Sequence, residues 1–192
     1  MMHEKRIGLF ETANSKFLNL QSDLITSGVS ERTLCGALML YLYEEIKGTD
    51  FSNYYVDVEY NRNMGKVKTI VNEDFKAIAI NCDLIIHSRG RCLNEDNLIA
   101  IEMKKSTNKK SEKLKDKNRL IALTKDTFDD VWSFDGTTLP EHVCRYGLGV
   151  YYEVNVNRKQ VTLGTILKVN CLLLRQLNYA NNVALASSGK LV

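Results

Sequence analysis

Hydrophobic residues recur at helical spacing through the first quarter of the chain, which predicts two helices there. Between residues 4 and 26 the apolar positions lie close to one stripe of a helix, and Gly28 marks its end. A second helix is predicted from Glu31 to Lys47, with Ser30 as its N-cap and Gly48 as its stop. The apolar stripe of this second helix consists of Leu34, Leu38, Tyr41 and Leu42.

The pattern then changes to the alternation that is typical of strands. Residues 54–62 place Val56, Val58 and Tyr60 on one face, with Asp57 and Glu59 on the other. A turn from Asn61 to Gly65 follows, and residues 66–74 are polar enough to form a short helix or a loop. Further strands are predicted over residues 75–86, 98–104, 145–156 and 161–169.

One more helix is predicted between the strand over residues 98–104 and the strand over residues 145–156. Ser111 can cap it, and its inward face would consist of Leu114, Leu120, Ile121 and Leu123. Residues 128–140 are rich in turn formers, and residues 157–160 form a hairpin-like turn. From Cys171 onward the chain predicts a short helix or strand that packs on the core or on a second copy, ending in a mobile tail.

Composition bounds the class of protein. The chain has 192 residues, 44% of them hydrophobic and 26% charged, and a net charge of +3, as in an ordinary soluble domain. No apolar run approaches the roughly 20 residues that span a bilayer, and the first 16 residues contain no signal-peptide core. The five cysteines are widely spaced and form no CxxC pair, which argues against a zinc site or a disulfide framework. We therefore expect a cytoplasmic protein with no membrane partner.

Candidate chemistry is concentrated between Asn81 and Lys105. Two apolar runs there predict neighbouring strands, one opened by Asp83 and the other ending in Glu102, Met103 and Lys104. Because side chains alternate along a strand, Glu102 and Lys104 share one face. Asp83 can supply a second carboxylate from the neighbouring strand, and a pair of carboxylates is typical of a Mg²⁺ site that leaves room for substrate phosphate. The alternative is a strand that ends in a solvated Glu-Lys pair.

These residues resemble the motif of the PD-(D/E)xK nucleases, also called restriction-endonuclease-like. Asp83 and Glu102-x-Lys104 carry the match, while Cys82 stands where the family usually has proline. The resemblance implies that Asp83, Glu102 and the main-chain carbonyl of Met103 bind Mg²⁺, for which Mn²⁺ would substitute. It also implies that Lys104 positions and polarises the attacking water. The pKa of Lys104 need not fall for that role, although burial and the nearby metal would push it down.

Glu31 is a further candidate for the metal site. Many relatives in the resembled family carry a glutamate on the helix before the first core strand, and Ser30-Glu31-Arg32 begins such a helix. Favourable interaction with the helix dipole would equally explain an acidic residue in the first turn. Glu44 and Glu45, later on the same helix, are the fallback. Other acidic and imidazole side chains are left outside the site, with strand-edge solvation expected for the acids: Asp57, Glu59 and His87.

The resemblance also implies a fold. It is an α/β restriction-endonuclease-like core with a central mixed β-sheet flanked by helices, in the order αβββαβ. This core would cover residues 30–156. Residues 1–29 would form an N-terminal helical extension, and residues 157–192 a C-terminal hairpin strand and tail packed on the core.

The expected activity is Mg²⁺-dependent hydrolysis of phosphodiester bonds, by an endonuclease rather than an exonuclease and with DNA favoured over RNA as substrate. A basic segment follows Lys104 and would attract phosphate, although a solvated helix face is the simpler explanation. The residues expected to contact nucleic acid are Lys105, Lys109, Lys110 and Arg62. A homodimer would suit double-strand cleavage. Two other functions remain open: an inactive nucleic-acid-binding module with the same fold, and a protein-interaction partner.

Overall fold

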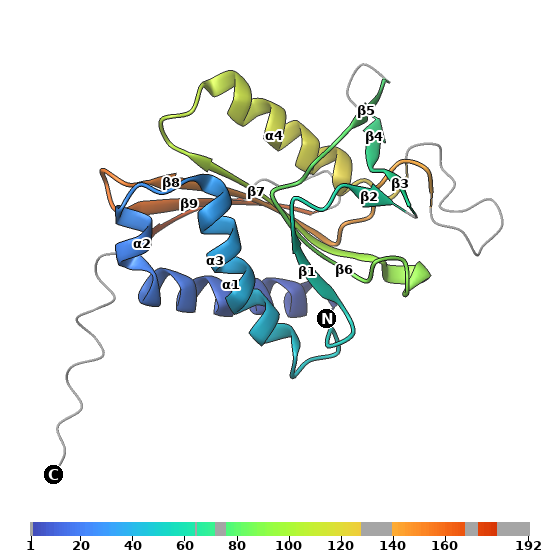
Figure 1. Cartoon of the computed structure of the whole chain (residues 1–192), viewed down its shortest axis with the longest axis horizontal. Helices are drawn as coiled ribbons and strands as arrows, with labels where there is room; N and C mark the ends of the chain where they lie inside the picture. Colours follow the sequence, from blue (N-terminus) through green and yellow to red (C-terminus); the bar gives the residue numbers. More distant parts are fainter. Residues whose placement is uncertain (1, 64, 72–75, 128–139, 168–172, 180–192) are drawn as a thin grey trace, which may run out of the picture.

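The computed structural model describes residues 2–63, 65–71, 76–127, 140–167 and 173–179. The chain is a mixed α/β protein with a mainly antiparallel central sheet, covered by helices on both faces (Figure 1). Six strands form this sheet in the order β1-β6-β7-β8-β9-β10. Their bounds are β1 (Tyr55–Val58), β6 (Leu84–His87), β7 (Asn97–Lys105), β8 (Leu148–Asn155), β9 (Gln160–Ile166) and β10 (Leu173–Asn178).

One parallel pair interrupts the antiparallel sheet. β1, β6 and β7 form a meander, and α4 (Lys110–Leu123) then leads the chain to β8, which pairs in parallel with β7. A parallel neighbour requires such a crossover because a tight turn can join only antiparallel strands. β9 and β10 continue the sheet as antiparallel strands. The predicted parallel strand and the mixed sheet flanked by helices are therefore confirmed.

Two long helices cover one face of the sheet. α1 (Met2–Leu20) packs against α3 (Glu31–Ile46), and both contribute to one buried cluster with alternate residues of β6, β7 and β8. A short helix, α2 (Ser22–Thr26), separates them, where the sequence predicted one helix over residues 4–26. The Oγ of Ser30 accepts a hydrogen bond from Thr33 N, so the predicted N-cap of α3 is confirmed.

α4 covers the opposite face of the sheet, but the side of the helix that faces the sheet differs from the predicted one. Leu120 and Leu123 are fully buried, but Leu114 is 58% exposed and does not face inward. The buried position one turn before Leu120 belongs instead to Asp116. The helix also begins at Lys110, after Lys109, so Ser111 is not its N-cap.

Two small hairpins extend from the sheet. Three predicted elements in this part of the chain, residues 54–62, 66–74 and 75–86, differ in the structure. Glu59 has a positive φ of 51°, which ends the first strand at Val58 and turns Tyr60 to the other face. There the Tyr60 ring packs at a tilt against the ring of His87. Residues 66–71 are extended rather than helical, while residues 72–75 lie outside the described residues. The described part of residues 75–86 is divided between β5 (Ala77–Ala79) and β6. The hairpins are β2 (Arg62–Asn63) with β3 (Lys66–Val67), and β4 (Thr69–Val71) with β5 (Ala77–Ala79).

The predicted strand over residues 161–169 is confirmed as β9, and the segment after Cys171 contains the edge strand β10. The turn-rich stretch predicted at residues 128–140 and the C-terminal tail lie almost entirely outside the described residues. None of the helices in the described ranges combines the length and the apolar character that a membrane crossing requires.

Candidate active site

Asp83 and Glu102 meet at the point where β6 begins and β7 nears its end. In the antiparallel register Leu84 pairs with Ile101, so Asp83 lies across from Glu102 on the face covered by α4. Asp83 Oδ2 accepts a hydrogen bond of 2.8 Å from Met103 N, which fixes its carboxylate against β7. The two carboxylates are close enough to perturb one another's pKa. The predicted convergence of these two residues is present in the structure.

Lys104 joins the two carboxylates from the next position on the same face of β7. Its Nζ lies 3.3 Å from Glu31 Oε2, 3.8 Å from Asp83 Oδ2 and 3.2 Å from Asp116 Oδ2. Burial by itself would lower the pKa of Lys104, but the three carboxylates outweigh it and raise the pKa above its ordinary value. Burial thus acts on the pKa of Lys104 in the direction expected from the sequence, but without metal the carboxylates decide the outcome.

Glu31 belongs to the site through Lys104 and the backbone beside it. At the N-terminus of α3 its Oε1 accepts a 2.9 Å hydrogen bond from Lys105 N, and its Oε2 accepts one from Lys104 Nζ. The first turn of α3 is thereby tied to the end of β7. The fallback glutamates do not join the site, because Glu44 pairs with Lys47 and Glu45 with Lys16.

Glu102 is the most deeply buried charge in the site. Its side chain is 0% exposed, and Oε1 accepts a hydrogen bond of 2.7 Å from Arg119 Nη1. The other oxygen, Oε2, is buried and has no hydrogen-bond partner. Burial raises the pKa of Glu102 to about 8, with Arg119 lowering it and Asp83 and Asp116 raising it further. A carboxylate with an unpartnered buried oxygen is costly unless a cation or a proton compensates it.

Two residues of α4 complete the cluster and were missed by sequence reasoning. Asp116 is 4% exposed and contacts Lys104, while Arg119 bridges Glu102 and Asp116 at 2.7 and 3.3 Å. Helical phase could have found Asp116, since it precedes the buried Leu120 by four residues. Both had been counted only as members of a charged run.

The oxygen atoms at the site fit a hard divalent cation. Asp83 and Glu102 supply carboxylates, and Oε2 of Glu102 is free to coordinate. Met103 O accepts a 3.2 Å hydrogen bond from Lys104 Nζ and keeps a second lone pair. In the described ranges, no three His, Cys, Asp or Glu side chains are grouped so as to hold a metal ion. A cation here would therefore be held by two carboxylates and a carbonyl, with Arg119 competing for Glu102.

The residues expected to contact nucleic acid lie in different surroundings. Lys105 Nζ donates to Gly28 O at 2.7 Å, which anchors the end of β7 to the turn before α3. Lys109 and Lys110 are exposed at the start of α4, next to the end of β7. Arg62 is exposed in β2, on a hairpin away from this helix, and lines a separate small cavity. The structure thus brings three of the four to the end of β7.

Asp57 is not solvated, contrary to the prediction. Its Oδ2 lies 2.9 Å from His87 Nε2 and accepts a 2.8 Å hydrogen bond from Arg89 Nε, and its side chain is 16% exposed. These two partners lower the pKa of Asp57 to about 2, against the opposing effect of burial. Glu59 pairs with Arg32 on the surface at 3.1 Å. Neither acid reaches the Glu102 cluster.

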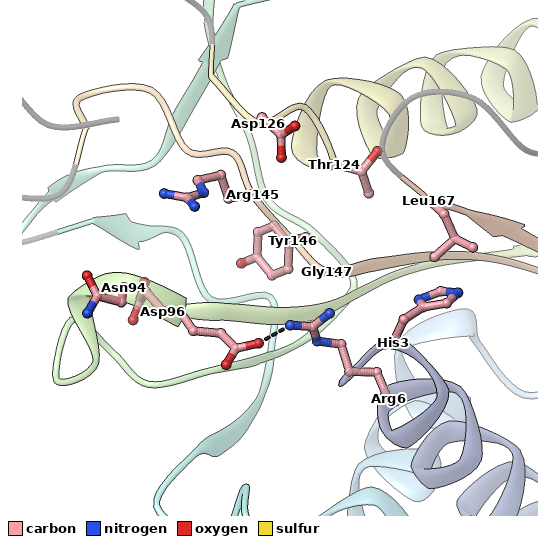
Figure 2. Close-up of a pocket in the computed structure, with 11 residues that line it drawn as sticks. His3, Arg6, Asn94, Asp96, Thr124, Asp126, Arg145, Tyr146, Gly147 and Leu167 are labelled. Atoms are coloured by element: carbon pink, nitrogen blue, oxygen red, sulfur yellow. Dashed lines mark hydrogen bonds and ion pairs between the residues drawn. The ribbon is translucent and has the colours of Figure 1, made fainter. Parts of the chain in front are cut away.

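A cavity of about 550 Å³ lies near the other end of β7 (Figure 2). Asp96, on its wall, is six residues from Glu102, which corresponds to about 20 Å along a strand. Figure 2 shows Arg6 from α1 reaching across to its ion-pair partner Glu95, with Arg145 and Tyr146 on the far side. Cations and carboxylates are mixed around this cavity, whereas the carboxylates near α4 have a shortage of partners. The candidate chemistry therefore belongs to the Glu102 cluster.

Comparison of the chain with protein-family models, with curated proteins and with solved structures finds no match.

Proposed function

We propose that this protein is a metal-dependent nuclease that hydrolyses phosphodiester bonds, with DNA favoured over RNA. The observation that carries the proposal is the meeting of Asp83, Glu102 and Lys104 from two adjacent strands, with one buried glutamate oxygen left unpartnered. The order α3, β1, β6, β7, α4, β8 supports a restriction-endonuclease-like core, to which the sequence motif is similar.

Each residue has a role that its surroundings support. Asp83 and Glu102 would hold Mg²⁺ or Mn²⁺ together with Met103 O, and when bound the ion supplies Lewis-acid polarisation of the phosphate. In the protein without metal the raised pKa of Lys104 keeps its amine protonated at neutral pH, so we do not assign it the role of a base. It instead offers a fixed positive charge toward the attacking water and the charge that develops on the phosphate.

Glu31 acts on the site through Lys104. Its carboxylate holds both the Lys104 ammonium and the Lys105 amide, so it keeps the end of β7 and the amine in register. Its side chain is 25% exposed, which leaves it open to the solvent from which a water molecule would approach. The exposed Lys109 and Lys110 at the start of α4 would hold the backbone of the nucleic acid by neutralising phosphates.

The test compares cleavage by the wild type with that by two lysine variants. Mixed DNA and RNA substrates are incubated with Mg²⁺ or Mn²⁺, and the initial rate is measured for Lys104→Met and for Lys115→Met, an exposed lysine of α4. We expect Lys104→Met to lower the rate at least about a hundredfold, as for loss of one electrostatic stabiliser, and Lys115→Met to leave it within about twofold. Equal rates for wild type and Lys104→Met would refute the role of Lys104.

One observation favours a second candidate, a nucleic-acid-binding module of the same fold that does not hydrolyse its ligand. Arg119 and Lys104 already pair with carboxylates of the cluster, so the protein has internal counter-ions where a metal would bind. This candidate predicts salt-dependent binding that survives Asp83→Asn, since phosphate affinity comes from lysine and arginine. Wild-type protein that binds DNA but cleaves nothing with either metal would favour it over the nuclease.

A further inference from the structure

A buried lysine lies outside the candidate active site, between the sheet and the two hairpins. Lys68 separates β3 from β4 and is 2% exposed. Its Nζ donates to Tyr146 Oη at 3.2 Å and lies 5.3 Å from the centre of the Tyr60 ring and 5.8 Å from that of the Tyr146 ring. Two aromatic rings and one hydroxyl group thus surround an ammonium group that is buried away from solvent.

The described residues satisfy only part of this ammonium. It has three N–H donors, and they provide one hydrogen bond, to Tyr146. Asp57 is paired with His87 and Arg89. One oxygen of Asp96, Oδ1, accepts hydrogen bonds from Ser88 Oγ and Gly90 N. Burial lowers the pKa of Lys68 to about 8, so the amine remains mainly charged at neutral pH. A buried cation with spare donors calls for an acceptor from outside the chain.

A small cavity adjoins Lys68. Its volume is about 30 Å³, room for one water molecule or for one oxygen of a larger group, but not for a nucleobase. The buried Lys68 and His87 form its floor, while the exposed Arg62 and Arg89 lie at its opening. Three cationic side chains therefore line the cavity together with one carboxylate, that of Asp96, and one of the three, Arg89, is already paired with Asp57 behind it.

We propose that this cavity is a phosphate-binding site, in which Lys68 donates to one phosphate oxygen while Arg62 and Arg89 contact the oxygens left outside. Charge-assisted hydrogen bonds from an ammonium and from guanidinium groups are the usual means of holding a phosphate. The group could be a free phosphate, the terminal phosphate of a nucleic acid or one in its backbone. This proposal concerns binding alone and does not require that the Glu102 cluster hydrolyse anything.

The position of the cavity relates it to the candidate active site. Asp83 and His87 lie at the two ends of β6 and on the same face of the sheet, since they are four residues apart. That separation corresponds to about 13 Å along a strand. Phosphates of one B-DNA strand advance about 3.4 Å per nucleotide along the axis, so one strand would reach both places within a few nucleotides.

The first experiment measures binding of inorganic phosphate to the full chain by calorimetric titration, with chloride at the same ionic strength as reference. Lys68→Met removes the ammonium while keeping an unbranched side chain, and it removes a buried charge, so we expect it to fold. Lys66→Met, at an exposed position in β3, two residues before Lys68, is the matched control. We expect Lys68→Met to weaken phosphate binding at least about tenfold and Lys66→Met less than about twofold. Equal affinities for wild type and Lys68→Met would overturn the proposal.

A second experiment identifies the source of the phosphate. Binding of a 5′-phosphorylated and a 5′-hydroxyl single-stranded DNA is measured with a chelator present, so that cleavage plays no part. If Lys68→Met weakens only the phosphorylated strand, the site takes a terminal phosphate. Equal weakening of both strands assigns it to the backbone. If Lys68→Met weakens binding of inorganic phosphate but of neither DNA strand, the site takes free phosphate. A wild type that binds none of these probes more tightly than chloride refutes the site.

Discussion

Arg119 Nη1 lies 2.7 Å from Glu102 Oε1, and the second oxygen of the same carboxylate has no hydrogen-bond partner. The guanidinium is therefore an internal counter-ion that satisfies half of a fully buried acid. It also contacts Asp116 at 3.3 Å, so one arginine holds two carboxylates whose charges would otherwise repel. A divalent cation that binds Glu102 must share this carboxylate with Arg119 or displace it.

Replacing Arg119 should make the site more responsive to metal and less stable without it. Arg119→Gln leaves Glu102 and Asp116 short of a partner, which we expect to lower the free energy of unfolding by about 1–3 kcal/mol without metal. Mg²⁺ would then compensate more uncovered charge, so the rise in melting temperature on adding Mg²⁺ should be at least about twice that of the wild type. Thermal unfolding at about pH 9, above the pKa of Glu102 in the wild type, checks both effects.

Arg158→Gln is the control for this experiment, because Arg158 is an exposed residue of the turn between β8 and β9. It removes the same charge from the protein without touching the cluster. The same Mg²⁺ response in both variants and in the wild type would show that Arg119 does not compete with a cation.

The raised pKa of Glu102 makes stability depend on pH in a defined direction. The pKa is about 8 in the folded protein, against a reference value of 4.5, so the folded state binds more protons than the unfolded state between these values. The free energy of unfolding contributed by this group therefore falls as pH rises through that window. Glu102→Gln cannot ionise and should not show this loss.

Chemical denaturation at several pH values checks this expectation. Between pH 5 and pH 8 the stability of Glu102→Gln relative to the wild type should rise by about 2–4 kcal/mol, since one pKa unit corresponds to about 1.4 kcal/mol. Glu112→Gln, an exposed acid of α4, should track the wild type throughout. A stability gap that stays constant with pH would mean that Glu102 is ionised over the whole range.

The sequence could predict Asp83, Glu102 and Lys104 because strand alternation is strict and short-ranged. A period of two fixes which residues of β7 share a face, and the neighbouring antiparallel strand supplies Asp83. Helical phase was harder to read in α4, where the stripe through Leu114 competed with the one through Leu120. In the structure Asp116 and Leu120 are buried and Leu114 is exposed. Hydrophobic patterning could not predict this, because it assigns a charged residue such as Asp116 to the surface.

The Lys68 cluster could not be predicted from the sequence in this way. Lys68 and Tyr146 are 78 residues apart, and they meet only because the β4–β5 hairpin folds over the same face of the sheet as α4. The positive φ of Glu59 turned Tyr60 toward this cluster and was hidden within an apparently continuous alternation. Local periodicity gives no sign of such a reversal.

Gly147 should accept a side chain only if the guanidinium of Arg6 moves aside, and a double variant tests this. A Cβ at this position would overlap the guanidinium of Arg6, which is packed against the glycine and paired with Glu95. Gly147→Ala should lower the free energy of unfolding by about 1 kcal/mol, the low end for overpacking, because the flexible Arg6 side chain can move at the cost of its own contacts. In an Arg6→Ala background the same substitution should cost less than half as much, and denaturant titration of all four proteins measures the coupling. Equal costs in the two backgrounds would place the strain elsewhere.

Lys68 should give the protein a second pH dependence, opposite in direction to that of Glu102. Burial lowers the pKa of Lys68 to about 8 from a reference value of 10.5, so between these values the unfolded state binds the extra proton. Stability contributed by this group therefore increases as pH rises through that window. Between pH 8 and pH 10 the free energy of unfolding of the wild type, relative to that of Lys68→Met, should rise by about 2–3 kcal/mol, since one pKa unit corresponds to about 1.4 kcal/mol.

Comparison with Lys68→Met cancels the titration of other groups that both proteins share. Lys66→Met serves as the exposed control in the neighbouring strand β3. Near neutral pH, Lys68→Met should be the more stable protein, because it removes a buried charge that two tyrosine rings and one hydroxyl only partly compensate. Saturating phosphate should narrow that gap, since it binds the folded wild type and supplies the missing acceptor. A gap that phosphate leaves unchanged would contradict binding at Lys68, even if the pH dependence followed the expected direction.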